Sequence, residues 1–241
     1  MPSRRRLLLA LAAAPLVARP AIAALPPMTF FTENAEPYNF RDGERIVGIG
    51  GDMVHELARR SGIAARIEML PWARAYQGAL DTPNSAVFST FRTEPREALF
   101  HWVGRVVDTE WALFARRGTQ LRLANLEAAR GMTIAGSPEH APTSRLAAQG
   151  FTIEMAPSHE TNVRKLQAGR LELWGTANPA ASFIARRLGV EIEPVVVFHR
   201  VAMEIAVNLR SDAAAVAALR EAYGAMERDG SVAAIRARYI A

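Results

Sequence analysis

The chain has 241 residues, no cysteine and a formal net charge of +5. Without cysteine, it can form neither a disulfide framework nor a thiolate metal site. Its basic residues are dispersed rather than gathered into a dense stripe, so we expect no nucleic-acid partner.

The first 23 residues predict an export signal. Arg4, Arg5 and Arg6 precede an apolar run over 7–17, and Ala21-Ile22-Ala23 supplies a small-residue cleavage pattern. The run is shorter than the roughly 20 residues that a membrane-spanning helix needs. Paired arginines favour the twin-arginine route, although a general secretory signal would look much the same. We therefore predict a periplasmic protein, cleaved near Ala23, whose formal charge falls to +1 with the loss of four arginines.

Residues 24–115 alternate between short apolar strands and amphipathic helices. One helix is predicted to start near Asp52, a favourable N-cap residue, and to stop at Gly62. A second helix, over 73–80, follows the strand-breaking Pro71. The predicted strands are 28–31, 65–70, 86–89, 102–107 and 111–115.

The rest of the chain repeats this alternation. Predicted strands at 132–135, 151–155 and 171–174 alternate with helical segments at 144–149, 161–168 and 179–188. Strands at 195–198 and 203–209 come next, then a helix from Ser211 or Asp212 and a short final helix with Ile235 and Tyr239. Alternating units of this kind indicate α/β layers with largely parallel sheets.

Known catalytic and metal-binding motifs fail at particular positions. A zinc helix built on His55 would need a second histidine at position 59, where Arg59 stands. The glycine-rich segment 48–51 would need a further glycine at Met53 to bind a dinucleotide. The histidines, scattered without metal-ligand spacing, are His55, His101, His140, His159 and His199. We expect no metal, no cofactor and no catalytic residue.

The segment 88–104 carries the clearest functional pattern. Its first strand ends in small polar residues, Thr93 and Arg96 form a T-x-x-R motif, and an apolar strand follows. Supporting motifs are Glu36-Pro37-Tyr38-Asn39-Phe40, Leu70-Pro71-Trp72-Ala73-Arg74, Leu166-Gln167-Ala168-Gly169-Arg170 and Asp229-Gly230. Their order and spacing, from about residue 30 to 239, resemble bacterial extracellular solute-binding proteins of the polar amino-acid type.

The resemblance implies a two-lobed α/β fold of the type II periplasmic-binding-protein kind, with hinged lobes that each contain a central, mostly parallel sheet. Lobe 1 would comprise 24–115 plus 204–241 and lobe 2 would comprise 116–203, with crossings near Phe114 and Met203. Such a protein is a monomer that captures a small molecule between its lobes. It then delivers the ligand to an ABC permease in the inner membrane, without catalysis.

The resemblance also implies that Arg96 binds a ligand carboxylate, with Arg92 as a second candidate. A guanidinium suits this role because its planar fork of donors matches a carboxylate. Alternatively, both arginines lie on the surface and pair with Glu94 or Glu97.

Further candidate ligand-binding residues come from the same motifs. Trp72 occupies a position that faces the cleft in this family, where an aromatic ring can stack on a ligand. The alternative is that Trp72 packs in the core. Ser89 ends a strand, the place where parallel α/β sheets bind ligands. Tyr38 and Trp111 would suit the cleft or simply cover the sheet, and Arg74 would suit the cleft or solvent.

Lobe 2 departs from the family pattern at the expected ammonium site. Seven residues beyond Arg170, where the family has an aspartate, the chain has Ala177, with the neutral candidate Asn178 beside it. A buried ammonium without a carboxylate partner is costly. An organic acid or another anion is therefore as plausible a ligand as an α-amino acid.

Two rival functions share this fold. A periplasmic dehydratase of cyclohexadienyl acids would need Glu172 or His140 as its acid or base, and these residues show no paired arrangement. A sensory module would report ligand binding to a receptor instead of a transporter.

Overall fold

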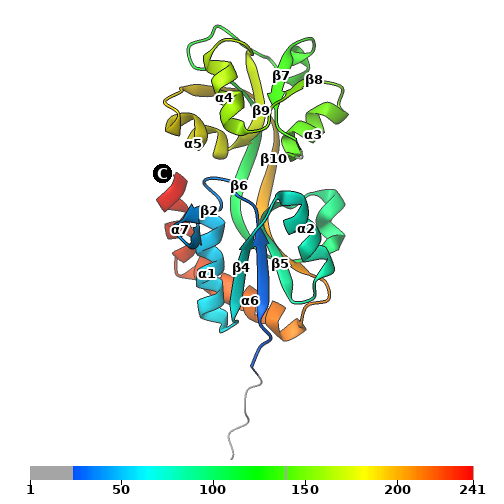
Figure 1. Cartoon of the computed structure of the whole chain (residues 1–241), viewed down its shortest axis with the longest axis vertical. Helices are drawn as coiled ribbons and strands as arrows, with labels where there is room; N and C mark the ends of the chain where they lie inside the picture. Colours follow the sequence, from blue (N-terminus) through cyan, green and yellow to red (C-terminus); the bar gives the residue numbers. More distant parts are fainter. Residues whose placement is uncertain (1–23, 139, 241) are drawn as a thin grey trace, which may run out of the picture.

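The computed structural model describes residues 24–138 and 140–240, so the predicted export signal at 1–23 lies outside the described residues. Two lobes are joined by two long strands, β6 (Phe100–Arg116) and β10 (Ile192–Asn208) (Figure 1). These strands pair antiparallel along their length. They lie at the centre of a sheet of strand order β4-β1-β5-β10-β6-β9-β7-β8, so both lobes are built on one two-stranded ribbon.

Lobe 1 contains three parallel strands beside this ribbon. Its strands are β1 (Met28–Thr32), β2 (Phe40–Asp42), β3 (Arg45–Val47), β4 (Ala65–Met69) and β5 (Ser85–Phe91). Its helices are α1 (Ile49–Ser61), α2 (Trp72–Asp81), the short η1 (Glu94–Leu99), α6 (Ala213–Arg228) and α7 (Ser231–Ile240). β1 pairs parallel with both β4 and β5, while β2 and β3 form a separate hairpin.

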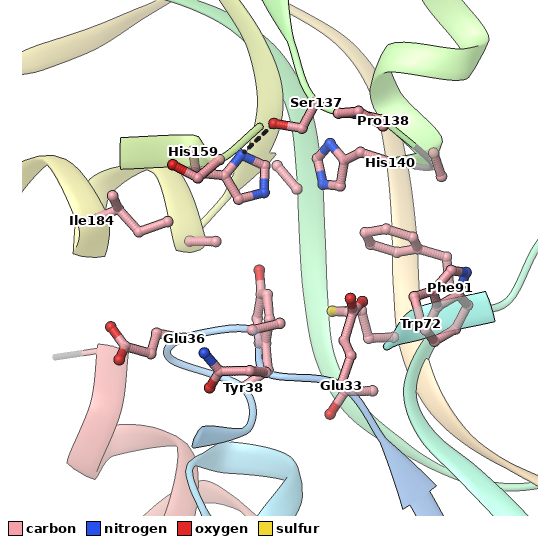
Figure 2. A pocket seen from close by; sticks show the side chains of 18 of the residues that line it. Glu33, Glu36, Tyr38, Trp72, Phe91, Ser137, Pro138, His140, His159 and Ile184 are labelled. Atoms are coloured by element: carbon pink, nitrogen blue, oxygen red, sulfur yellow. Dashed lines mark hydrogen bonds between the residues drawn. The ribbon is translucent and has the colours of Figure 1, made fainter. Parts of the chain in front are cut away.

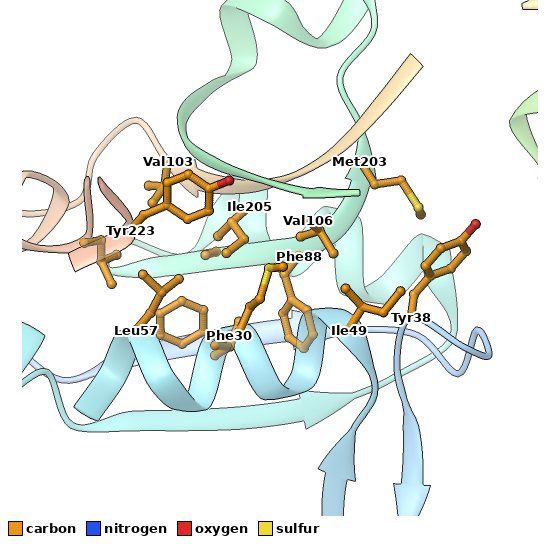
Figure 3. Packing of buried hydrophobic residues seen from close by; sticks show 14 of the residues in the cluster. Phe30, Tyr38, Ile49, Leu57, Phe88, Val103, Val106, Met203, Ile205 and Tyr223 are labelled. Carbon is orange, nitrogen blue, oxygen red and sulfur yellow. The ribbon is translucent and has the colours of Figure 1, made fainter. Parts of the chain in front are cut away.

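The core of lobe 1 lies between its sheet and the helices α1, α6 and α7. Phe30 of β1 and Phe88 of β5 face Leu57 of α1, and Ile205 of β10 completes the buried layer (Figure 3). All four side chains are almost fully buried. Burial of each such side chain contributes about 1.5–3 kcal/mol, which fixes the sheet under the helices.

The first helix begins earlier than the predicted N-cap at Asp52. Gly48 occupies the cap position with a φ of 102°, and a Cβ there would lie 2.5 Å from the carbonyl oxygen of Tyr38. Only glycine fits that backbone and that space. The predicted stop at Gly62 is confirmed, because this residue adopts the left-handed C-cap conformation.

Lobe 2 repeats the α/β arrangement on the other end of the ribbon. Its strands are β7 (Thr133–Gly136), β8 (Thr152–Met155) and β9 (Leu173–Asn178). Its helices are η2 (Leu126–Ala129), α3 (Ala141–Ala148), α4 (His159–Gln167) and α5 (Ala180–Arg187). β7 pairs parallel with β8 and β9, and β9 pairs antiparallel with β6. The predicted two-lobed α/β class is confirmed.

The ribbon differs from the predicted elements, since two pairs of predicted strands form two continuous strands. The polar residues around Thr109 interrupt the apolar pattern, but the backbone pairing of Thr109 with Val201 continues, and Thr109 Oγ1 donates to the Val201 carbonyl at 2.7 Å. Phe114 packs against Trp174 inside lobe 2. We therefore propose that the chain crosses between the lobes near Thr109 and Val201, before the expected crossing at Phe114 and close to that at Met203.

Within the described part of the chain, every helix falls short of the length and hydropathy that a membrane span requires.

Close packing between β6 and α6 gives a direct test of this fold. A Cβ at Gly104 would lie 2.3 Å from the ring of Tyr223, whose hydroxyl donates to the Arg105 carbonyl at 2.8 Å. Gly104→Ala should therefore lower the free energy of unfolding by about 1–3 kcal/mol in urea denaturation.

The matched control is Gly224→Ala in α6, where the added Cβ meets only the mobile end of Arg228, at 3.3 Å. This variant should keep or raise stability by about 0.5–1 kcal/mol, since alanine favours helix. Equal stability of the two variants would contradict the packing described here.

Candidate functional site

A cleft of about 570 Å³ lies between the two lobes. Lobe 1 lines it with the loop after β1, the start of α2 and the end of β5, and lobe 2 lines it with the loop after β7 and the starts of α4 and α5 (Figure 2). Most of these segments follow the carboxyl ends of parallel strands. Ligands of α/β proteins bind at that edge.

Arg96 lies in this cleft, held in place by its own lobe. Its Nη1 donates to Thr90 Oγ1 at 3.0 Å and to the Phe91 carbonyl at 3.3 Å. The guanidinium carbon lies 5.3 Å from the ring centre of Trp72 and 4.9 Å from that of Tyr76. Two aromatic faces therefore stabilise and orient the cation at the cleft wall.

Burial and the neighbouring groups act in opposite directions on the pKa of Arg96. Burial lowers the pKa of its guanidinium, while Tyr76 and Glu33 act in the opposite direction. An arginine remains charged under such shifts because its ordinary pKa lies so far above neutrality. The cleft therefore presents a partly desolvated, permanent positive charge in lobe 1.

Arg92, the second predicted carboxylate ligand, is engaged elsewhere. Its Nε donates to Glu97 at 2.8 Å, its Nη1 lies 3.4 Å from Glu204, and its guanidinium lies over the ring of Trp102. The hydrogen bond that Arg92 donates to Glu97 raises the pKa of Arg92. Arg92 does not line the cleft, and its pairing with Glu97 matches the alternative interpretation of this residue.

Ser89 and Tyr38 both line the cleft, as does Trp72. β5 continues to Phe91, past the strand end predicted at Ser89. Ser89 has a φ of 57°, unusual for a residue with a side chain, and its Oγ donates to Asn39 at 2.7 Å. Backbone strain of this kind concentrates at functional sites. The Tyr38 hydroxyl is buried opposite Ala180 of lobe 2 without a hydrogen bond of normal geometry, and burial raises its pKa.

Three other predicted residues do not line the cleft. Trp111 is buried behind the cleft wall, 5.1 Å from the ring of Phe91. Arg74 is exposed on α2, and Asn178 accepts a hydrogen bond from Ser182 at 2.8 Å.

Lobe 2 brings together two histidines that the motif pattern does not indicate as ligand-binding. His140 and His159 line the cleft with ring centres 4.8 Å apart, and His159 lies 5.6 Å from the ring of Trp174. Burial lowers the pKa of both imidazoles, and for His140 the neighbouring His159 lowers it further. Both rings are therefore neutral at pH 7. The usable sequence signal was position, because each follows the carboxyl end of a parallel strand.

The acid–base residues of the dehydratase alternative lie apart. His140 lines the cleft, whereas Glu172 is exposed and does not line it.

One arginine joins the two lobes across the cleft. Arg187 of α5 pairs with Glu36 of lobe 1 and, at 2.7 Å, with Glu160 at the start of α4. All three side chains are partly exposed, so the bridge is a weak and screened contact rather than a fixed joint.

The lowered pKa values of the histidine pair predict acid sensitivity. A histidine whose pKa falls below the ordinary 6.5 on folding binds protons more readily in the unfolded chain. Its stabilising contribution is present above about pH 6.5 and is lost as the pH falls below that value. Between about pH 7.5 and about pH 5.5, wild type should lose more free energy of unfolding than His140→Gln does. Equal losses in chemical denaturation would contradict this environment for His140.

Comparison with known proteins agrees with this architecture. The model of the bacterial extracellular solute-binding proteins, family 3, matches residues 28–241. The comparison with curated proteins gives no match.

Solved structures with the same fold come from binding and sensor proteins. A histidine kinase sensor domain with similarity to periplasmic binding proteins is 21% identical, with a TM-score of 0.77 over 89% of this chain and 96% of its own. The GluR0 ligand-binding core from Nostoc punctiforme, in complex with L-glutamate, is 15% identical, with a TM-score of 0.77 over 89% and 99%. A mutant of ArgBP from T. maritima is 16% identical, with a TM-score of 0.74 over 89% and 94%. With a family model that covers nearly all the described residues, the chain belongs to the bacterial extracellular solute-binding proteins, family 3.

Proposed function

We propose that this protein captures a small, carboxylate-bearing molecule between its lobes in the periplasm and delivers it to a membrane transporter. The observation that carries the proposal is the position of Arg96 in the cleft, beside the rings of Trp72 and Tyr76. Its planar donors suit a carboxylate, and desolvation strengthens the bond. The solved neighbours support the same chemistry, since one is described in complex with L-glutamate and another as bound to arginine.

The two lobes provide the closing motion that such capture requires. Tyr38 already faces Ala180 across the cleft, and Arg187 reaches Glu36. A ligand that touches both lobes shifts the equilibrium toward the closed form, because it gains contacts there that the open form lacks. The closed form then presents a surface to the permease. Closure would equally serve a sensory role, which the histidine kinase sensor domain with this fold supports as a second candidate.

The cleft differs from an ordinary amino-acid site in lobe 2. Ala177 lines it where the family resemblance places an acidic partner for the ligand ammonium. We therefore favour organic acids over α-amino acids as ligands.

A thermal-shift screen of amino acids, organic acids and amines tests the proposal. A ligand that binds only the folded state raises the melting temperature, so carboxylates should give the hits. Arg96→Ala should weaken their binding by about tenfold to 150-fold, because each charge-assisted hydrogen bond contributes about 1.5–3 kcal/mol. Isothermal titration with the best hit measures this loss.

Arg74→Ala is the matched control, since Arg74 is an exposed arginine on α2 that does not line the cleft. This variant should bind the hit as wild type does. An unchanged affinity in Arg96→Ala would remove Arg96 from the site.

The dehydratase alternative is tested by incubating the mature protein with prephenate. We expect no conversion to phenylpyruvate, because Glu172 lies outside the cleft and His140 is held neutral beside a second imidazole. Absorbance of the product in alkali measures the reaction. Steady product formation that His140→Gln abolishes would overturn the binding-only function.

A further inference from the structure

We propose that lobe 2 recognises an uncharged oxygen acceptor at the far end of the ligand through Nε2–H of His159. The ligand class is then a monocarboxylic acid with a distal hydroxyl or keto oxygen. This inference rests on the proposed function, in which Arg96 holds the carboxylate, and it concerns the opposite wall of the same cleft (Figure 2).

The tautomer of His159 follows from a chain of hydrogen bonds that starts at Asn162. The Asn162 side-chain nitrogen lies 3.0 Å from the Gly136 carbonyl, which only accepts, so the amide must present its nitrogen there. The same nitrogen donates to Ser137 Oγ at 3.2 Å.

Ser137 Oγ accepts from Asn162, and its own hydroxyl proton still needs an acceptor. His159 Nδ1, at 3.3 Å, is the acceptor that the described residues offer it. A neutral imidazole whose Nδ1 accepts carries its proton on Nε2. The chain from Asn162 through Ser137 therefore sets His159 as a donor at its other ring nitrogen.

This donor is available to a ligand. Figure 2 shows the rings of His159 and His140 on the cleft side of lobe 2, and both residues line the cleft. The described residues provide Nε2 of His159 with no hydrogen-bond partner. His159 is half-buried at the cleft wall, so a ligand oxygen that reaches this wall could accept from its Nε2–H and complete the site.

The charges around the pair select an uncharged group. Burial lowers the pKa of His140 and His159, so neither ring offers a positive charge to a second carboxylate at pH 7. Glu160, the acidic residue beside His159 that also lines the cleft, is paired with Arg187, and so is Glu36 across the cleft.

The start of α4 adds no competing anion site. Ser158 caps the helix by accepting from the Thr161 amide at 3.2 Å, and the Glu160 carboxylate bonds its own backbone amide. A distal carboxylate or ammonium at His159 would have to compete with the Glu36–Arg187–Glu160 contact for a counter-charge, whereas a hydroxyl or keto oxygen gains the imidazole N–H directly.

Isothermal titration of the mature protein tests this inference with matched acids of about four to six carbons. Each length is tested with a distal hydroxyl, keto, methyl, carboxylate or ammonium group. The hydroxy or keto acid of the best-fitting length should bind at least about tenfold more tightly than its methyl, carboxylate and ammonium counterparts. His159→Phe should erase this preference while leaving the affinity for the methyl acid within about twofold.

His159→Gln keeps a side-chain N–H and should retain part of the preference, which separates hydrogen bonding from simple packing. Nitrogen NMR of the imidazoles reads the tautomer directly, with protonated Nε2 expected for His159 in wild type and loss of that bias in Ser137→Ala. An Nδ1–H tautomer in wild type would overturn the inference.

The outcomes distinguish this inference from the proposed function. Arg96-dependent binding with the same order of affinities in wild type and His159→Phe would overturn the role of lobe 2 alone. If no acid binds, or if binding ignores Arg96→Ala, both proposals fail.

Discussion

The antiparallel pairing of β6 with β10 is the constraint on which the rest of the molecule depends. The two strands run through both lobes, and their backbone hydrogen bonds continue from Asn208 paired with Phe100 to Ile192 paired with Arg116. Each lobe then adds its own parallel strands to one end of this ribbon. Because the lobes share strands rather than a loose linker, any relative motion of the lobes would have to bend or twist the ribbon.

The ribbon also explains where the cleft lies. In each lobe the parallel strands end toward the other lobe, so the loops that follow them face one another across the gap. Lobe 1 contributes the end of β5 and Arg96, and lobe 2 contributes the loop after β7 and the start of α4. The two walls differ in chemistry. One carries a permanent charge framed by aromatic rings, and the other carries neutral imidazoles.

Much of the fold was predictable because local sequence signals agree with the tertiary structure. Gly62 ends α1 in a left-handed conformation, and Asp212 caps α6 by accepting from the Ala215 amide. The continuous ribbon was not predictable, since the exposed polar residues near Thr109 interrupt the apolar pattern while the backbone pairing persists. The start of α1 was missed because close backbone contact at Gly48, which is tertiary information, overrides a good capping residue at Asp52.

The residues of the candidate site were likewise only partly predictable from the sequence. A motif spacing brings out Arg96 and Trp72, which lie together in the cleft, but it cannot separate Arg96 from Arg92. That separation depends on the pairing of Arg92 with Glu97 nearby in the chain and with Glu204, 112 positions away. The histidine pair matches no motif, because 19 positions separate His140 from His159 and the parallel pairing of β7 and β8 brings them together; the position of each histidine after a strand was the available signal.

The ion pairs of Arg187 are more sensitive to dissolved salt than the charge of Arg96 is. Its partners Glu36 and Glu160 are reached by solvent, so dissolved ions weaken the attraction that draws the lobes together, over a screening distance of about 10 Å at 0.1 M salt. Arg96 is shielded by two rings and by its own lobe, and its attraction for an anion is screened much less. In the proposed capture of a carboxylate, ionic strength would therefore change the closure of the lobes more than the bond between Arg96 and the ligand.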